Sequence, residues 1–378
     1  MGNLKVHDKL DIQAGGQVEV LDEFGSGGQG TVYKVSYNGK TYALKWYHPG
    51  VFKGKENDFY KNLENNISNG APTDAFLWPK AITKVYNDQF GYLMDVRPSG
   101  YEELTNFFVG GRKQKQARFK SFYALCTAAI NIIEAFRALH NNGYSYQDIN
   151  NGNFFINPEN GDVLICDNDN VSPFGTNLGI MGKQRWMAPE IVMGKNDPDK
   201  NSDRFSLAVV LFRLLFINHP LEGRYSTPPC MTKEAEQKYY GSAPIFVYDP
   251  STTENRPIPG TDHNLKLFWN VYPDYVKEAF IRAFSHDVMM KQKPRILEKE
   301  WMDIFIRLRT EIGRCPYCGQ ETFYTFKGSH DIPCMECGKK IPITNALQIK
   351  NQILPIFPGL KISLWTLRTI RQIYAPSA

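Results

Sequence analysis

The fold of this chain is decided by residues 146–153, which read YQDINNGN, and by Asp167, fourteen positions beyond Asn153. Asp148 precedes Asn153 by five positions, and two short apolar runs separated by a turn lie between Asn153 and Asp167. This pattern predicts a loop, a strand, a hairpin and a second strand, with two carboxylates and an amide at the exposed ends. Phosphoryl transfer uses such a set, because one acid orients the attacking hydroxyl while an Asn and an Asp hold Mg²⁺. By itself, an Asp near an Asn in a loop is more often a turn or a cap.

Composition describes an ordinary folded protein of more than one unit. The chain has 378 residues, 42% hydrophobic and 13% aromatic content, and a formal net charge of +5. The length predicts two or three globular units, and the modest charge does not favour a nucleic-acid partner. The N-terminus lacks the apolar region of a signal peptide, and the longest apolar run, 207–217, is too short to span a bilayer. Three scattered cysteines favour a reducing compartment, so we expect a cytoplasmic protein without a membrane span.

Residues 17–47 alternate apolar and polar side chains and predict three strands. Asn38-Gly39, between the second and the third, is a strong hairpin signal. Between the first two strands lies GSGGQG at 25–30, and β-branched and aromatic residues follow it. This segment therefore bridges two strands and does not open a helix. Its glycines allow backbone N–H groups to approach a phosphate closely.

Helical periodicity appears in the segments that follow. Residues 55–68 place their apolar side chains on one face and predict a helix. A strand at 90–96 closes the strand-rich part of the chain. Residues 119–141 then predict a long amphipathic helix that leads into residues 146–153, called the catalytic stretch below.

These segments, in this order, resemble the protein kinases. The resemblance covers residues 17 to about 308 and implies an α+β, bilobal kinase fold, with a small β-rich N-lobe at 1–97 and a larger helical C-lobe at 98–310. Beside the catalytic stretch and Asp167, it is carried by the glycine-rich loop, Ala43-Leu44-Lys45, Ala188-Pro189-Glu190, a helix that opens at Asp203, and residues 295–301.

The resemblance implies a role for each matching residue. Asp148 orients the substrate hydroxyl, Asn153 and Asp167 hold Mg²⁺, and Lys45 positions the ATP phosphates. A helix glutamate is expected to hold Lys45, and Glu64 is preferred over Glu56 because it lies mid-helix, nineteen residues past Lys45. ATP is expected to contact three glycines of the glycine-rich loop, Gly25, Gly27 and Gly30, and three residues of the strands, Val32, Ala43 and Lys45. It is also expected to contact the gatekeeper Met94, the hinge residues Asp95 and Val96, and the metal ligands Asn153 and Asp167.

Three features of the C-lobe are also implied. Asp203 is expected to hold the backbone of the catalytic loop, and Arg295 is expected to pair with Glu190. The Pro- and Asn-rich segment 219–264 is interpreted as an exposed insertion and a candidate docking surface.

Departures from the kinase pattern leave alternatives open. Gln147 replaces the usual Arg, which makes the pattern non-RD, Asn150 replaces the catalytic-loop Lys, and Asn168-Asp169 replaces Phe-Gly. We expect an active, ATP-dependent Ser/Thr protein kinase, because the catalytic groups proper are present. The alternative is a pseudokinase scaffold that acts through nucleotide binding and the C-terminal module. A third interpretation is a nucleic-acid module regulated by a kinase.

A lysine on the activation segment, residues 167–190, offers a replacement for the charge that is lost where Asn150 stands in place of the catalytic-loop Lys. Lys183 follows Gly182, where similar kinases carry a Thr that meets the catalytic Lys and Asp. We hypothesise that Lys183 reaches Asp148 or the γ-phosphate; the alternative is a solvated lysine. Because Gln147 carries no charge to hold a phosphate, activity is expected not to require phosphorylation at Ser172 or Thr176.

Residues 311–378 differ in character from the rest of the chain. They carry two Cys-x-x-Cys knuckles separated by fifteen residues: Cys315, Cys318, Cys334 and Cys337. Four thiolates on two tight turns match a structural Zn²⁺ ribbon, and redox pairs are the alternative. His330 is not expected to be a ligand, since four sulfurs close the site. Residues 346–371 are expected to form a small hairpin around Phe357-Pro358-Gly359.

The D-N-D variant at 167–169, the linked ribbon and the phrase HPLEG at 219–223 are similar to bacterial eukaryotic-like kinases. The similarity is to those encoded beside a metal-dependent phosphatase and a von Willebrand A-domain protein. It implies these two proteins as partners besides a protein substrate, and a role in signalling or stress response. The implied cofactors are ATP, Mg²⁺ and Zn²⁺.

Overall fold

Alternating residues of the N-terminal part form one antiparallel sheet in the computed structural model, which describes residues 4–108, 116–228, 230–325, 331–349, 352–358 and 360. The strands lie in the order β1-β2-β3-β4-β6-β5. The predicted hairpin at Asn38-Gly39 is confirmed, because it joins β3 to β4 and its residues have φ of 48° and 73°, as a type I′ turn requires. The strands are β1 (Lys9–Asp11), β2 (Gln17–Ser26), β3 (Gly30–Tyr37), β4 (Lys40–Tyr47), β5 (Ala81–Ile82) and β6 (Gly91–Met94).

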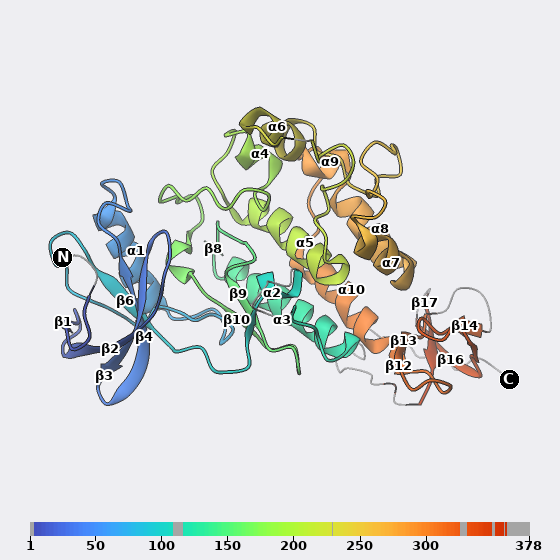
Figure 1. The fold of residues 1–378 in the computed structure, drawn as a ribbon, viewed down its shortest axis with the longest axis horizontal. Coiled ribbons are helices and arrows are strands. Elements are labelled where there is room, and N and C mark those ends of the chain that lie inside the picture. The colour runs from blue at the N-terminus through green and yellow to red at the C-terminus, as the bar shows by residue number, and fades with distance from the viewer. Residues whose placement is uncertain are drawn as a thin grey trace.

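The two faces of this sheet bury different clusters. Leu44 and Trp46 of β4 belong to a cluster with the first strands, whereas Ala43 and Tyr47 belong to a cluster that includes helix α1 (Glu56–Asn69). Because side chains alternate along a strand, Lys45 lies on the α1 face. The helix expected at 55–68 is confirmed, and it stands beside the sheet in Figure 1.

Three long helices build the core of the C-lobe. Helix α3 packs against α5 and α10 (Figure 1), and their apolar side chains share one large cluster. Among the described residues, α3 is the one helix long and apolar enough to span a bilayer, but its apolar side chains form the core of this lobe. The helices are α2 (Thr105–Phe108), α3 (Phe122–Asn141), α4 (Pro189–Val192), α5 (Lys200–Phe216), α6 (Lys233–Gln237), the π-helix η2 (Lys238–Ser242), α7 (His263–Val271), α8 (Asp274–Ala283), α9 (His286–Met289) and α10 (Glu298–Thr310).

Short strands flank the catalytic stretch on both sides. The predicted hairpin after Asn153 is confirmed as β9 and β10, which pair antiparallel. Strand β8 enters the catalytic stretch and pairs with β11 of the activation segment. The strands are β7 (Glu102–Glu103), β8 (Tyr144–Ser145), β9 (Phe154–Ile156), β10 (Val163–Ile165) and β11 (Ser172–Pro173).

The prediction that 219–264 is an exposed insertion is wrong for much of the segment. Leu221, Phe246 and Val247 are at most 1% exposed. Phe246 stacks on Phe284 at 5.4 Å between ring centroids, so its aromatic residues extend the core of the C-lobe. The composition suggested an insertion because Pro and Asn are frequent in loops, whereas packing is decided by the apolar residues between them.

A small β module follows α10 at the end of the C-lobe (Figure 1). Its expected hairpin is present, but β16 and β17 pair before residue 357, so the turn expected at 357–359 is displaced; residues 361–371 of that prediction lie outside the described part of the chain. Glu321 accepts a hydrogen bond from the Phe122 backbone N at 2.6 Å, which joins the module to the start of α3. The strands are β12 (Ile312–Arg314), β13 (Glu321–Phe323), β14 (Asp331–Pro333), β15 (Lys340–Pro342), β16 (Asn345–Ile349) and β17 (Gln352–Ile356).

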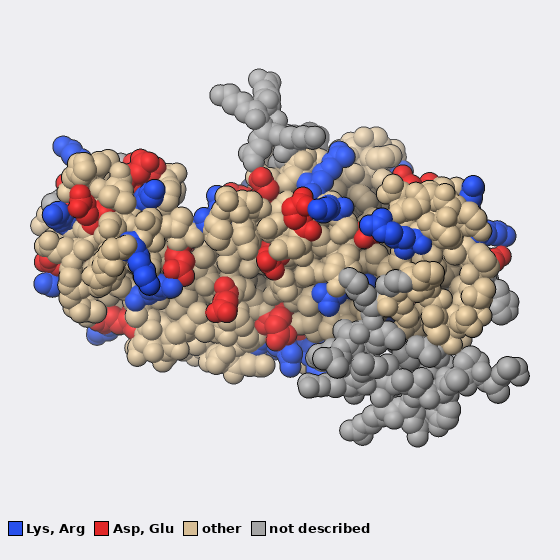
Figure 2. Space-filling view, turned by 90° about the horizontal axis from the view of Figure 1, so that it is seen from below, with Lys and Arg blue, Asp and Glu red and all other residues tan. Residues whose placement is uncertain are grey.

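Charged side chains of both signs share the molecular surface. On the face shown in Figure 2, the described Lys and Arg residues lie interspersed with Asp and Glu over both lobes. Such mixing is typical of a soluble surface without a strong field of one sign.

Candidate active site

Asp203 of helix α5 holds the backbone of the catalytic stretch. Both oxygens of the Asp203 carboxylate accept backbone hydrogen bonds, from Tyr146 N at 2.7 Å and from Gln147 N at 2.9 Å. Asp203 is 2% exposed, and His140 on α3 contacts the same carboxylate at 3.1 Å. The expectation that Asp203 holds this loop is therefore confirmed.

Two neighbouring amides donate hydrogen bonds to Asp148. Asn153 Nδ2 donates to the Asp148 backbone oxygen at 2.9 Å, and Asn150 Nδ2 donates to Asp148 Oδ1 at 3.1 Å. Burial raises the pKa of Asp148 to about 6, with Asp167 adding to the rise while Asn150, Lys183 and Lys45 oppose it. Asp148 can therefore accept a proton or a hydrogen bond from a hydroxyl near neutral pH.

The two expected metal ligands have free oxygen atoms. The amide contact of Asn153 with the loop leaves its Oδ1 without a donor among the described residues. Asp167 follows β10 with a left-handed backbone, φ 55°, and its side chain is 37% exposed. Carboxylate and amide oxygens suit Mg²⁺, so Asn153 and Asp167 are fit to hold this ion.

The expected pair between Lys45 and Glu64 does not form, which corrects the prediction. Glu64 accepts a hydrogen bond from Gln13. The alternative, Glu56, accepts one from Gly54 N at 3.3 Å. The reason is the rotation of α1: Asn62, two residues from Glu64, faces the site, and at 100° per residue a shift of two turns a side chain to the opposite side.

Within the described part of the chain, three side chains accept hydrogen bonds from Lys45. Its Nζ lies 2.9 Å from Asp169 Oδ2, 3.3 Å from Asp167 Oδ1 and 3.1 Å from Gln29 Oε1 in the glycine-rich loop. Asp169 was noted in the sequence only as a departure from Gly, so its role was missed. The signal was an extra acid two positions after the metal-binding Asp167.

A continuous apolar surface adjoins these polar groups. Val32, Ala43, Met94 and Val96 belong to one cluster with Leu164 of β10. Ala43 lies opposite Met94 in the pairing of β4 with β6. The structure thus brings together the apolar residues that the sequence assigned to ATP binding.

The remaining predicted nucleotide contacts lie at the edges of this surface. Gly30 is required by packing, because a Cβ there would lie 2.4 Å from the Trp46 backbone oxygen. Gly25 and Gly27 lie on either side of the end of β2. The Asp95 side chain is exposed and pairs with Lys80 at 2.7 Å. It is therefore engaged outside the apolar cluster, and only the Asp95 backbone is suited to contact a nucleotide.

The activation segment is tied to the catalytic stretch without charge. Gln147 Nε2 donates to Ser172 Oγ at 2.8 Å and to the Thr176 backbone oxygen at 2.7 Å. Ser172 is fully buried, so it is closed to modification in this state, whereas Thr176 is exposed. A neutral amide therefore joins the catalytic stretch to the activation segment.

Lys183 lies at the catalytic stretch but does not bond to Asp148. Its Nζ donates to Asn151 Oδ1 at 3.0 Å. It is near enough to Asp148 to lower the pKa of that carboxyl. At the end of the segment, Glu190 accepts hydrogen bonds from Arg295 with both carboxylate oxygens, at 2.9 and 2.7 Å, which confirms the expected pair.

A family model for the protein kinase domain matches residues 18–255. The chain belongs to the protein kinase family. The expected bilobal fold is thereby confirmed, and the departures described above are departures within this family.

Curated relatives of this chain include serine/threonine-protein kinases. The probable serine/threonine-protein kinase kinX of Dictyostelium discoideum is 26% identical over 52% of the chain and 18% of its own length. The stress-activated protein kinase alpha of the same organism is 26% identical over 58% of the chain and 33% of its own length. A serine/threonine-protein kinase of Candida albicans is 26% identical over 50% of the chain and 24% of its own length. The chain thus spans about a fifth to a third of the length of these relatives.

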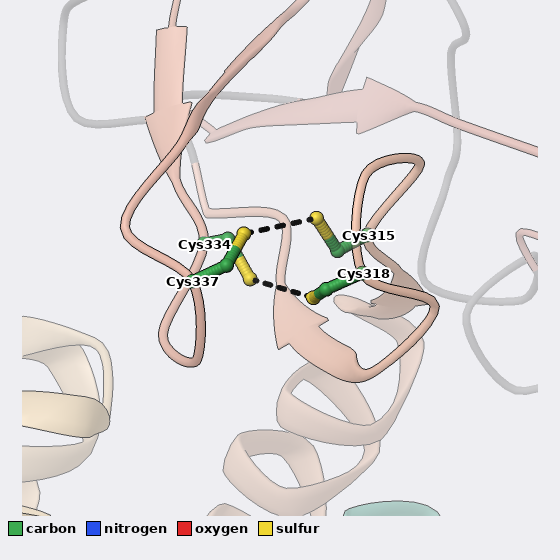
Figure 3. A group of neighbouring side chains, drawn as sticks. All are labelled: Cys315, Cys318, Cys334 and Cys337. Carbon is green, nitrogen blue, oxygen red and sulfur yellow. Dashed lines mark hydrogen bonds between the residues drawn. The ribbon is translucent and has the colours of Figure 1, made fainter.

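Beyond the matched range, the kinase carries a cluster of four cysteines (Figure 3). The Sγ atoms of Cys315, Cys318, Cys334 and Cys337 all lie within 4.8 Å of one another. Two of the separations are 3.8 and 3.7 Å, which is close to the edge of about 3.8 Å of a tetrahedron with Zn–S bonds of about 2.3 Å. The cysteines fit the predicted ion, and His330 lies outside the described residues.

Proposed function

We propose that this protein is an ATP-dependent Ser/Thr protein kinase that transfers the γ-phosphoryl group to protein hydroxyls. The observation that carries the proposal is that Asp148 bonds to Asn153, that Lys45 bonds to Asp167, and that Asp148 lies near enough to both of the latter to feel their charges, beside the apolar cluster around Ala43. Each of these groups has the chemistry that phosphoryl transfer needs. Relatives that are named serine/threonine-protein kinases support the Ser/Thr class.

The residues of the cleft divide the work between them. Asp148 accepts the hydrogen bond of the substrate hydroxyl and thereby orients it toward the phosphoryl group. Asn153 and Asp167 would hold Mg²⁺, which neutralises phosphate charge when bound. Lys45 holds the nucleotide phosphates, and the apolar surface takes the adenine. Gln147, in place of Arg, supports a non-RD mode in which the activation segment needs no phosphate.

Phosphoryl transfer from labelled ATP tests the proposal directly. The wild type should label itself or a generic Ser/Thr substrate, and Asp148→Ala should lower kcat by about 10²-fold or more. Asp162→Ala is the matched control, because Asp162 is exposed in the β9–β10 turn. Asp148→Ala should still bind a fluorescent ATP analogue. A wild type that binds the analogue without transferring phosphate would refute the proposal and favour the scaffold.

The C-terminal module and the partners complete the proposal. The four cysteines hold one structural Zn²⁺ that stabilises the module. The metal-dependent phosphatase and the von Willebrand A-domain protein are proposed as partners on the strength of the D-N-D variant and the linked ribbon. The bacterial grouping rests on the same resemblance, whereas the relatives reported above are eukaryotic. The proposed cytoplasmic location rests on the scattered cysteines.

A further inference from the structure

The buried carboxylate of Asp169 is an ionic partner of Lys45. The Lys45 and Asp169 side chains are 6% and 1% exposed. Lys45 Nζ lies 3.2 and 2.9 Å from the two oxygens of Asp169. Asp169 therefore forms the most buried ionic contact of Lys45, whereas Asp167 lies farther away at 3.3 Å and is partly exposed.

Two tyrosines complete the surroundings of this carboxylate. Tyr47 OH donates to Asp169 Oδ2 at 2.6 Å, and Tyr92 OH donates to Oδ1 at 3.1 Å. Each oxygen thus has one hydroxyl and the ammonium as partners. A buried charge is tolerated when its hydrogen bonds are satisfied in this way.

The sheet explains why these groups converge. Tyr47 follows Lys45 by two positions on β4, so both lie on one face. Tyr92 is the direct cross-strand neighbour of Lys45 on β6. The three side chains therefore line one surface of the sheet, and the 3₁₀-helix η1 (Asn168–Asn170) presents Asp169 to it.

Helix α1 contributes amides where an acid was expected. Asn62 and Asn66, one turn apart, donate to the Val171 backbone oxygen at 2.8 and 2.9 Å. Asn62 also donates to the Asp169 backbone oxygen at 3.4 Å. The helix thus holds the backbone that presents Asp169, and it sends no carboxylate to Lys45.

We propose that Asp169 has taken over from a helix glutamate as the residue that positions Lys45 for the nucleotide. This inference rests on the proposed kinase function. Asp169 and the metal-binding Asp167 belong to one short segment, so the lysine and the metal ion are aligned by the same piece of backbone. Because no α1 glutamate takes part, a rotation of α1 would not by itself separate Lys45 from its carboxylate partner. Helix α1 acts instead through Asn62 and Asn66, which hold the backbone that follows Asp169.

A double-variant cycle without nucleotide tests the pair itself. Asp169→Asn and Lys45→Met should each lower the midpoint of thermal unfolding, because each leaves a buried partner unpaired. The variant Lys45→Met/Asp169→Asn should unfold at a higher temperature than the sum of the two single losses predicts. Additive losses would show that the two side chains do not interact and would overturn the proposal.

Kinetics test the positioning role. Asp169→Asn should raise KM for ATP and lower kcat/KM by about tenfold or more, and Asp169→Glu should recover part of the loss. Glu64→Gln should leave kcat/KM within about twofold of wild type. Should Asp169→Asn fail to fold, Glu64→Gln still decides, because a tenfold loss there would return the positioning role to the helix glutamate and overturn the proposal.

The two proposals fail in different ways. A wild type without phosphoryl transfer would refute the proposed kinase function, while the unfolding cycle would still report on the pair. An active wild type with normal kinetics in Asp169→Asn would overturn the role of Asp169 and leave the kinase function standing.

Discussion

Replacing Arg295 by Met should destabilise the C-lobe strongly. The guanidinium donates to both oxygens of Glu190 and, at 2.8 Å, to the Asn201 backbone oxygen. The Arg295 and Glu190 side chains are 4% and 7% exposed. Removing the cation leaves a buried carboxylate without its partner, which costs about 3–5 kcal/mol. In a domain of this size, this cost corresponds to a fall of roughly 10 °C in Tm.

Thermal unfolding followed by circular dichroism measures the effect. The matched control is Arg282→Met, because Arg282 pairs with Glu300 on the surface, where the side chains are 54% and 44% exposed. An exposed pair contributes about 0.2–1 kcal/mol, so this control should lose at most a few degrees. Adding Glu190→Leu to Arg295→Met should restore part of the loss, because no buried charge then remains. Equal Tm values for the two Arg→Met variants would refute the reasoning.

Further predictions concern the activation segment, the zinc site and a buried histidine. Thr176→Ala should keep kcat within about twofold, because Gln147 bonds only to the backbone oxygen of residue 176; complete loss of activity would contradict this. Lys183→Ala should lower kcat by about 10²-fold if Lys183 supplies charge to the transition state; the exposed Lys195→Ala is its control, and a kcat within twofold of wild type would count against that role. Elemental analysis should find about one Zn²⁺ per chain, and chelation should unfold the C-terminal module while ATP-analogue binding persists; protein purified without chelator and free of zinc would end the idea. Burial lowers the pKa of His140, but the Asp203 and Glu298 carboxylates outweigh burial and raise it; the charged ring therefore stabilises the fold below about pH 6.5, and this contribution is lost as the pH rises through the higher pKa of the folded state. Denaturant midpoints between pH 6 and 9 should fall less in His140→Gln than in wild type, and parallel profiles would contradict the assignment.

Much of the fold follows from local patterns in the sequence. Asn38-Gly39 specifies its hairpin because both residues accept positive φ. The helix at α3 follows from apolar periodicity and from Ser121, which caps it by accepting from Ala124 N. The catalytic stretch and the two cysteine knuckles are also readable, because their members lie within a few residues of one another.

Tertiary structure decided which distant groups became partners. Glu64 and Asn62 are two residues apart on α1, and only the rotation of the helix against the sheet sends the amide inward and the acid to Gln13. Asp169 is 124 residues from Lys45, and no periodicity links such positions. The burial of Phe246 could not be predicted from the sequence either, because the residues it packs against, such as Phe284, lie far away along the chain.

The physical reason is one of range. Backbone preferences and side-chain periodicity act over a few residues, so the sequence by itself determined the elements, their order and the groups clustered within one loop. The partner of a buried charge is chosen by the packing of whole elements, which sets the positions of atoms to within an ångström and leaves Lys45 beside Asp169 and not beside Glu64.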